Sequence, residues 1–244
     1  MFSIFVMLPA AIFASVYALD QRGFFAIEDI DLQVMTQSEQ LNFSKPYMDT
    51  LNQELSAYKG QSLWRLSLSG VSEKLKAKSW IKDFRISRSW PQGLVVEIEP
   101  KILSLLYVDQ KRLALGFVRP VTSDGALLPE VDTTQAPPLA MLKGEVFVKD
   151  HAKRKIAIEL LKSLPEDGRL SHKIISEIGY DTKEGYWVEV AKTNIKIKLG
   201  DDQFAVKSAR VSQVLDYLEK RELKARVIDA NLSKKVLVRL QQNP

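Results

Sequence analysis

Hydrophobic and polar positions alternate along residues 79–99, and this period of two predicts a β-hairpin. On the first strand Phe84 and Ile86 face inward between charged neighbours. The segment Trp90-Pro91-Gln92-Gly93 is typical of a turn, and on the returning strand the apolar positions are Leu94, Val96 and Ile98. Pro100 has no backbone N–H to donate, so the strand cannot continue past it as a central strand of a sheet.

Apolar residues at helical spacing precede the hairpin. Ser69 is predicted to cap a short helix whose buried face is Leu68, Val71 and Leu75. A second helix is predicted after Ser44 as the N-cap and Pro46 as an early residue, with Met48, Leu51 and Leu55 on one face. Residues 24–34 alternate well enough for a strand, with a bulge or a late start near Ile27 and Ile30.

The order of these elements resembles the POTRA domain of the bacterial cell-division family FtsQ/DivIB. The resemblance rests on the pattern GxSLWxL, a helix, SWI, RxWP and a valine-rich strand, at Gly60, Ser62, Leu63, Trp64, Leu66, Trp80, Ile81, Arg88, Trp90, Pro91 and Glu99. It implies a domain over residues 24–99 in the order β-α-α-β-β. The chain departs from the family where Glu99 directly precedes Pro100.

The sequence that follows Pro100 predicts a second, β-rich domain over residues 100–244. Residues 102–108 are a short apolar run, Asp124-Gly125 favours a tight turn, and Asp150 is placed to cap a helix. That helix has the buried face Ala157, Leu160, Leu161 and Leu164, and strands are predicted at 174–180, 186–190, 195–199, 225–228 and 236–240, with a second helix after 200–202.

This order is similar to the second domain of the FtsQ family, with marks at Leu199, Gly200, Lys207, Ile228 and Asp229. The predicted fold class is therefore α+β: an N-terminal transmembrane helix, a POTRA domain, and a mixed or antiparallel sheet with two packed helices.

Residues 1–19 contain no charged side chain and as a helix would be about 28 Å long, close to the hydrocarbon thickness of a bilayer. We expect a transmembrane anchor. A cleaved signal peptide and a buried core helix are the alternatives, although the positive n-region of a signal peptide is missing. The positive-inside rule gives no orientation, since only Arg22 lies close to the segment.

The amino-acid composition limits the classes of function that the chain can have. The 244 residues are 45% hydrophobic and 27% charged, as in ordinary globular proteins. The chain has no cysteine, which excludes disulfides, thiol nucleophiles and thiolate metal sites. The net charge of +5 would suit an anionic partner, but the densest basic run, residues 149–155, fits a solvated helix face. No aromatic residues are interleaved with it, so no nucleic-acid partner is predicted.

No catalytic constellation is evident. His151 and His172 lie in polar contexts, the pairs Glu97/Glu99 and Asp201/Asp202 fit solvated positions, and no phosphate loop, zinc-protease or nucleophile-elbow motif is present. Trp64, Trp80 and Trp90 are expected to be core or loop anchors. We therefore predict no catalytic residue, no metal, no cofactor and no small-molecule substrate.

The last strand is the candidate binding site. A terminal strand often lies at a sheet edge, where a partner's strand can be added, although it can equally just complete the sheet. In the FtsQ family the partner FtsB docks at this end of the β domain by adding a strand. The resemblance thus implies binding through Leu232, Lys235, Val236, Leu237, Val238, Arg239 and Leu240.

The family resemblance further implies a single-pass inner-membrane protein with most of its chain in the periplasm, acting at the division septum. There it would bind FtsB and FtsL type proteins and other divisome proteins, and help to recruit and regulate septal peptidoglycan synthesis. Two alternatives stay open. One is a POTRA-containing export or outer-membrane assembly component, which should carry tandem POTRA units or barrel strands. The other is a periplasmic hydrolase that depends on Glu97 or Asp202.

Overall fold

The computed structural model describes residues 13–35, 45–232 and 235–241. The chain divides into two compact units, Met1–Lys101 and Ile102–Pro244. Most of the proposed membrane segment 1–19 and the predicted cap Ser44 lie outside the described residues.

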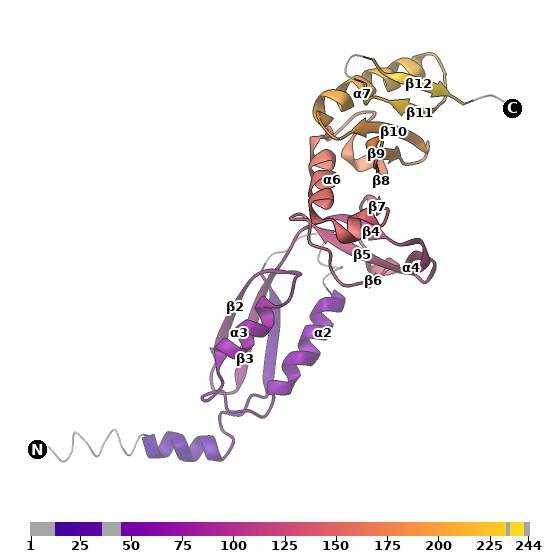
Figure 1. The fold of residues 1–244 in the computed structure, drawn as a ribbon. Coiled ribbons are helices and arrows are strands. Elements are labelled where there is room, and N and C mark those ends of the chain that lie inside the picture. Colours follow the sequence, from indigo (N-terminus) through magenta and orange to yellow (C-terminus); the bar gives the residue numbers. More distant parts are fainter. Residues whose placement is uncertain (1–12, 36–44, 233–234, 242–244) are drawn as a thin grey trace, which may run out of the picture. The chain divides into compact units, whose positions relative to one another are not determined.

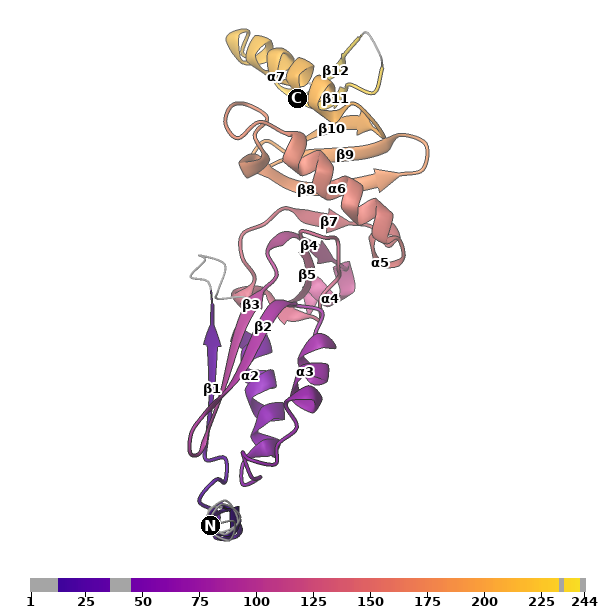
Figure 2. The same ribbon diagram turned by 90° about the vertical axis from the view of Figure 1, so that its left-hand side faces the viewer.

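The first unit is a three-stranded sheet with two helices packed against it (Figures 1 and 2). Its elements are β1 (Asp29–Val34), α2 (Lys45–Leu55), the 3₁₀ turn η2 (Ser56–Tyr58), α3 (Leu68–Lys76), β2 (Ile81–Ser89) and β3 (Gly93–Pro100). The strand order is β1-β3-β2, with β1 parallel and β2 antiparallel to the central β3. The predicted order β-α-α-β-β is confirmed.

The core of this unit follows the alternation in the sequence. Leu94, Val96 and Ile98 are fully buried, as predicted, and they face a layer formed by Leu51, Leu55, Val71 and Leu75 of the helices. Arg88 shares the inward face of β2 and donates from Nε to the carbonyl of Leu63 at 2.9 Å and from Nη2 to that of Leu66 at 2.8 Å. This arginine therefore holds the loop before α3 against the sheet.

One local prediction needs correction, and another is confirmed. Ser69 is not the cap of α3: the N-cap position is Ser67, and its hydroxyl lies 2.7 Å from that of Ser69 and does not bond to the helix backbone. The two serines satisfy each other, which leaves the first turn uncapped by a side chain. The predicted late start of the first strand is confirmed, because Ile27 bonds to the carbonyl of Gln61 before β1 begins at Asp29.

Residues 13–21 are helical and precede the sheet. Within the described residues, no helix has the length and apolarity required to cross a membrane. The helix is tied to the first unit by Asp20, whose side chain is 5% exposed and lies 2.8 Å from Nε of Arg65.

The second unit is built on a nine-stranded mixed sheet (Figure 1). Its strands are β4 (Leu103–Val108), β5 (Phe117–Thr122), β6 (Val131–Asp132), β7 (Met141–Lys143), β8 (Ile175–Asp181), β9 (Gly185–Val190), β10 (Ile195–Gly200), β11 (Ala225–Asp229) and β12 (Leu237–Leu240). Along the sheet the order is β12-β11-β10-β9-β8-β7-β4-β5-β6. Parallel pairing joins β10 to β11, β7 to β8 and β4 to β7.

Two long helices, α6 (His151–Ser163) and α7 (Phe204–Lys220), contact each other and supply the helical side of the core. Asp150 caps α6 as predicted, accepting from the backbone N–H of Lys153 at 3.1 Å. The described chain also contains two short helices that the pattern did not predict, α4 (Gln110–Ala114) and α5 (Val146–Lys149). Each is only about one turn long, too short for a helical period to be read.

Among the described residues of the second unit, the buried cations are Arg154 and Lys207, and both bind backbone carbonyls. Arg154 is 7% exposed and donates to the carbonyls of Gly125 at 2.7 Å and Phe147 at 2.5 Å, and burial lowers the pKa of its guanidinium. Lys207 is 4% exposed and its ammonium donates to the carbonyl of Leu199 at 2.8 Å and to Asp202 at 2.7 Å. Arg154 thus joins α6 to α5 and to the turn at Gly125, and Lys207 joins α7 to the end of β10.

Candidate functional site

The last described strand, β12, is the edge of the large sheet. It pairs antiparallel with β11, with Asp229 opposite Leu237 and Ile228 opposite Val238. On its other side it has no strand neighbour among the described residues. An edge strand presents unpaired N–H and C=O groups, which is the chemical requirement for binding another strand.

The direction of each backbone group on β12 follows from one hydrogen bond. The N–H of Gln241 donates to the carbonyl of Lys224 at 2.8 Å, so the backbone groups of Gln241 face β11. Backbone groups in an antiparallel strand alternate in direction from one residue to the next. The pairing has a register shift in which β11 contributes one extra residue between Ala225 and Val227, so the alternation along β12 itself is not interrupted. The N–H and C=O groups of Val238 and Leu240 therefore point away from β11, toward the open edge.

The side chains of β12 divide between its two faces. Val236 and Val238 are half-buried and pack against the core. On the other face Lys235 and Arg239 are exposed, and Leu237 is 55% exposed. Leu240 is 47% exposed although the alternation would place it with the valines. The open edge is thus flanked by exposed apolar side chains.

The strand is shorter than the pattern predicts. It begins at Leu237, whereas alternation alone suggested a start at Lys235 or Val236. Leu232 follows a turn in which the N–H of Asn231 donates to Asp229 at 3.0 Å, and its side chain is 45% exposed. The structure thus brings Leu237 to Leu240 together as a strand and places Leu232, Lys235 and Val236 in the connection that leads to it.

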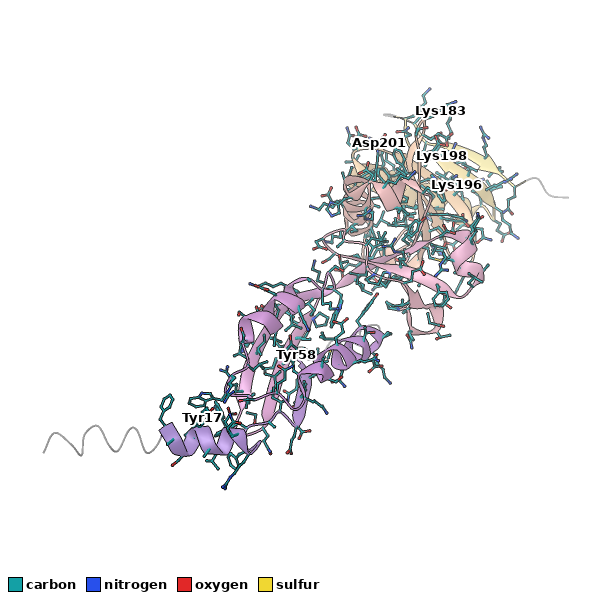
Figure 3. The ribbon with its side chains drawn as sticks, turned by 60° about the horizontal axis from the view of Figure 1, so that its bottom comes forward. Tyr17, Tyr58, Lys183, Lys196, Lys198 and Asp201 are labelled. Atoms are coloured by element: carbon teal, nitrogen blue, oxygen red, sulfur yellow. The ribbon has the colours of Figure 1, made fainter. Side chains whose placement is uncertain are left out.

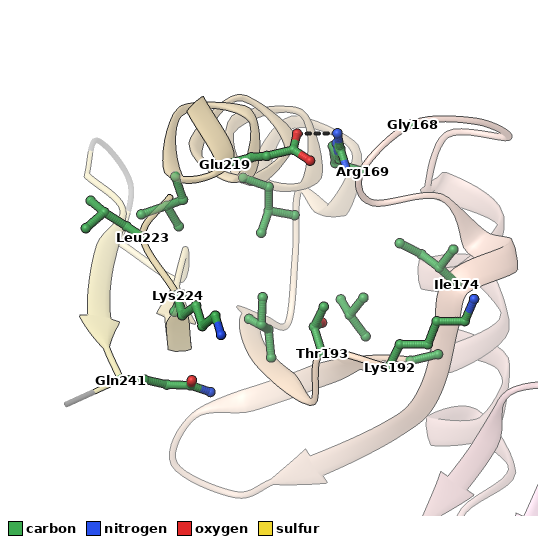
Figure 4. Close-up of a pocket in the computed structure, with 15 residues that line it drawn as sticks. Gly168, Arg169, Ile174, Lys192, Thr193, Glu219, Leu223, Lys224 and Gln241 are labelled. Atoms are coloured by element: carbon green, nitrogen blue, oxygen red, sulfur yellow. Dashed lines mark ion pairs between the residues drawn. The ribbon is translucent and has the colours of Figure 1, made fainter. Parts of the chain in front are cut away.

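An apolar groove of about 680 Å³ opens beside the end of β12 (Figure 4). This volume lies in the range of sites that hold a small ligand or a group of side chains. Its wall comes from the turn before β8, from β9, β10 and their connection, from the end of α7 and from the start of β11. The apolar lining residues are Ile174, Val190, Ala191, Ile195, Leu215, Leu218, Leu223 and Ala225. Gln241, one residue after β12, also lines it, so the groove reaches the end of this strand.

Charged side chains border the groove. The guanidinium of Arg169 pairs with Glu219 across its rim, and its Nε lies 3.9 Å from Asp216 (Figure 4). Lys192 and Lys224 also line the groove. All three charges of the Arg169 cluster are more than half exposed, so the pair is weak and can exchange partners.

Sequence reasoning did not find this groove. Its lining comes from five separate segments, one of which includes Leu215 and Leu218 on the inner face of α7. The turn that borders it contains Lys192 and Asn194 at φ 66° and 52°, a left-handed conformation in which asparagine is common but lysine is not. A Thr-Asn turn signal was therefore present, but it says nothing about a groove.

The side chains considered for catalysis are not brought together by any contact in the structure. His151 Nε2 lies 3.1 Å from the carbonyl of Asp124, and His172 Nδ1 lies 3.4 Å from that of Pro165. Glu99 pairs with Lys82 at 2.6 Å, and Asp202 pairs with Lys207. Within the described ranges, no group of three histidine, aspartate or glutamate side chains is placed to hold a metal ion.

Trp64, Trp80 and Trp90 differ in how far they are buried. Trp80 is 4% exposed and stacks on Tyr47 with ring centroids 5.7 Å apart, as expected for a core residue. Trp64 and Trp90 touch each other, with centroids 5.8 Å apart, but each is 51% exposed. They anchor two loops together without being covered.

A small sheet with two helices followed by a large mixed sheet defines a two-domain protein of the POTRA-containing class. Comparison with known families agrees: residues 48–99 match the POTRA domain, FtsQ-type, and residues 112–231 match the C-terminal domain of cell division protein FtsQ/DivIB. The chain belongs to the FtsQ/DivIB family of cell-division proteins.

Three bacterial proteins are similar to the chain at low identity. Cell division protein FtsQ of Syntrophotalea carbinolica is 23% identical over 192 residues, which cover 74% of this chain and 64% of that protein. The FtsQ of Geobacter sp. strain M21 is 22% identical over 191 residues, covering 74% and 66% respectively. A shorter match, 29% identical over 79 residues, covers 32% of the chain and 23% of FtsQ from Zymomonas mobilis.

The matched region thus spans a little less than two thirds of the length of the first two relatives. The family match also ends at Ala230-Asn231, before Leu232 and the strand β12. The role of the edge strand consequently has to be argued from the geometry of this chain.

Proposed function

We propose that this chain is a single-pass inner-membrane scaffold of the division machinery, anchored by residues 1–19 and exposing both units on the periplasmic side. On this proposal it acts as a binding protein at the septum, with no catalytic step of its own. The charge-free segment 1–19 and the family membership support the anchor and the setting.

Its partner, we infer, is the FtsB–FtsL type of division protein, which adds a strand to β12. The observation that carries this proposal is the pair of outward-facing backbone positions at Val238 and Leu240, next to an apolar groove. A strand on the edge would bond to these positions, and the chain that follows it would place apolar side chains in the groove. Leu232, Lys235, Val236, Leu237 and Arg239 would add side-chain contacts along the same edge.

Val238→Pro tests this proposal directly. Because the N–H of Val238 faces outward, proline removes a donor that only the partner would use, while the pairing of β12 with β11 is kept. Leaving the partner's acceptor unpaired costs about 2 kcal/mol, which weakens binding about thirtyfold. Val238→Ala is the matched control, since it removes side-chain volume but keeps the N–H.

The measurement is titration of the purified full chain in detergent with a complex of the FtsB and FtsL periplasmic segments. The expected result is weak binding for Val238→Pro, near-normal binding for Val238→Ala, and unchanged circular dichroism for both. Equal binding by the proline and alanine variants would exclude strand addition at this position.

The place of action needs a separate test. A fluorescent fusion at the N-terminus, observed in dividing cells of the native host, is expected to form a ring at the constriction. A uniform envelope signal through division would contradict the septal role and favour the export or assembly alternative.

A further inference from the structure

Four aromatic side chains at one end of the first unit form an exposed cluster, which we call the aromatic patch: Phe24, Phe25, Trp64 and Trp90. Phe25 is at its centre, with its ring centroid 5.7 Å from Trp90, 6.3 Å from Trp64 and 5.2 Å from Phe24. Phe24, Trp64 and Trp90 are each about half exposed, at 48%, 51% and 51%.

The exposed patch is not formed by one loop alone. Its members come from three segments: the connection before β1, the loop before α3, and the turn between β2 and β3. A contiguous group of large aromatic side chains in contact with water is costly, and such patches mark surfaces that are covered in the working protein.

The helix of residues 13–21 connects the patch to the proposed membrane anchor. Asp20 binds both Arg65 and Ser62, and the guanidinium of Arg65 lies 5.6 Å from the ring centroid of Tyr17. Tyr17 lies where this helix meets the rest of the first unit (Figure 3). The attachment is thus made by an ion pair between the nearly buried carboxylate of Asp20 and the half-exposed guanidinium of Arg65, next to the patch.

The patch also has a defined position along that helix. Trp64 lines a small cavity together with Phe13, Val16 and Tyr17. Asp20 is the first charged residue of the chain, so all three of these helix residues belong to the charge-free segment. At 1.5 Å per residue, Phe13 lies about 10 Å from Asp20 toward the apolar end. Trp64 therefore sits beside the last turns of the proposed span.

We propose that the aromatic patch lies in the interfacial layer of the bilayer, with lipid headgroups and the first acyl carbons as its ligand. Tryptophan and tyrosine are enriched at this depth because their rings combine an apolar body with a polar N–H or O–H. The exposed cations Arg22 and Arg65 lie beside it, suited to lipid phosphates. The first unit would then rest on the membrane at the hairpin turn. This inference rests on the proposed anchor.

Depth labelling of the full chain tests the inference. The chain has no cysteine, so single cysteines can be introduced without background. Ser89→Cys places an environment-sensitive dye next to the patch, and Lys82→Cys places it at the other end of the same strand, about 23 Å away at about 3.3 Å per residue. Each labelled protein is reconstituted in vesicles of phosphatidylcholine and phosphatidylglycerol that carry a headgroup-proximal spin-label quencher.

The expected result is severalfold stronger quenching at position 89 than at position 82. The double variant Trp64→Gln/Trp90→Gln should remove most of this difference. Tyr217→Gln, which changes an aromatic of similar exposure (56%) on α7, should leave it unchanged.

Flotation of the same vesicles separates the two proposals. If the chain floats with the vesicles but positions 89 and 82 are quenched equally, the anchor stands and the lipid contact of the patch is wrong. In that case a protein partner is the better occupant. If the chain does not float, both the anchor and the lipid contact are overturned.

Discussion

Replacing Lys207 with methionine should destabilise the second unit and loosen the connection that leads to β12. The Lys207 ammonium bonds to Leu199 at 2.8 Å and Asp202 at 2.7 Å and lies 3.5 Å from Oδ1 of Asn231, so it ties the end of β10 to the turn after β11. Methionine fills a similar volume without a charge, which isolates the loss of these bonds from the creation of a cavity.

The expected loss in the free energy of unfolding follows from the groups that surround Lys207. Hydrogen bonds to a charged group contribute about 1.5–3 kcal/mol each. The side chain of Asp202 is 71% exposed, so its carboxylate regains water and adds little to the cost. Relief of the buried ammonium also offsets part of the loss. The free energy of unfolding should therefore fall by about 2–3 kcal/mol, which lowers the urea midpoint by about 1 M.

Urea unfolding followed by circular dichroism measures this change, with Lys220→Met as the matched control on the exposed end of α7. The control should stay within about 0.5 kcal/mol of the wild type. If Lys207→Met and Lys220→Met unfold at the same urea concentration, the assignment of Lys207 as a structural tie is refuted.

Two further predictions concern the same unit. Arg154→Met should lower the unfolding free energy by about 3 kcal/mol in urea melts, because carbonyls of Gly125, Phe147 and Val148 lose their buried donor, and an equal loss in Lys155→Met would contradict this. Tyr186 is fully buried, and burial raises the pKa of its hydroxyl, with Asp201 adding to the effect. The folded chain therefore keeps this proton after the unfolded chain has lost it, so stability is fully present below about pH 10 and falls above it. Urea melts at increasing alkaline pH should show this fall, and Tyr186→Phe should reduce it; equal alkaline losses in both proteins would rule out Tyr186 as its source.

The first unit could be predicted well because one face of its sheet is buried. A strand with one buried face must alternate, and the positions of Leu94, Val96 and Ile98 follow directly from that requirement. The misplaced cap at Ser69 has a different cause: two serines, Ser67 and Ser69, could both fill the role, and only the structure shows them bonded to each other. Trp64 and Trp90 were expected to be core or loop anchors, and they do join two loops, but their half-exposed position could not be predicted from the motif.

The candidate site was predictable only in part. The alternation of residues 235–240 indicates a strand, and its position near the end of the chain suggests an edge. The direction of the Val238 N–H depends on the register with β11, and the hydrophobic pattern of one sequence does not reveal that register. The groove depends on contacts between segments as distant as Gly168 and Gln241, so tertiary packing alone creates it.

The most direct test of the account is amide hydrogen exchange, at single-residue resolution, of the chain with and without the FtsB–FtsL type partner. The backbone of Val238 and Leu240 faces the open edge, while that of Arg239 faces β11. Binding by strand addition should slow exchange strongly at Val238 and Leu240, and much less at Arg239, which is already paired. Unchanged exchange at Val238 and Leu240 in a saturated complex would contradict the proposal that this edge is the binding site.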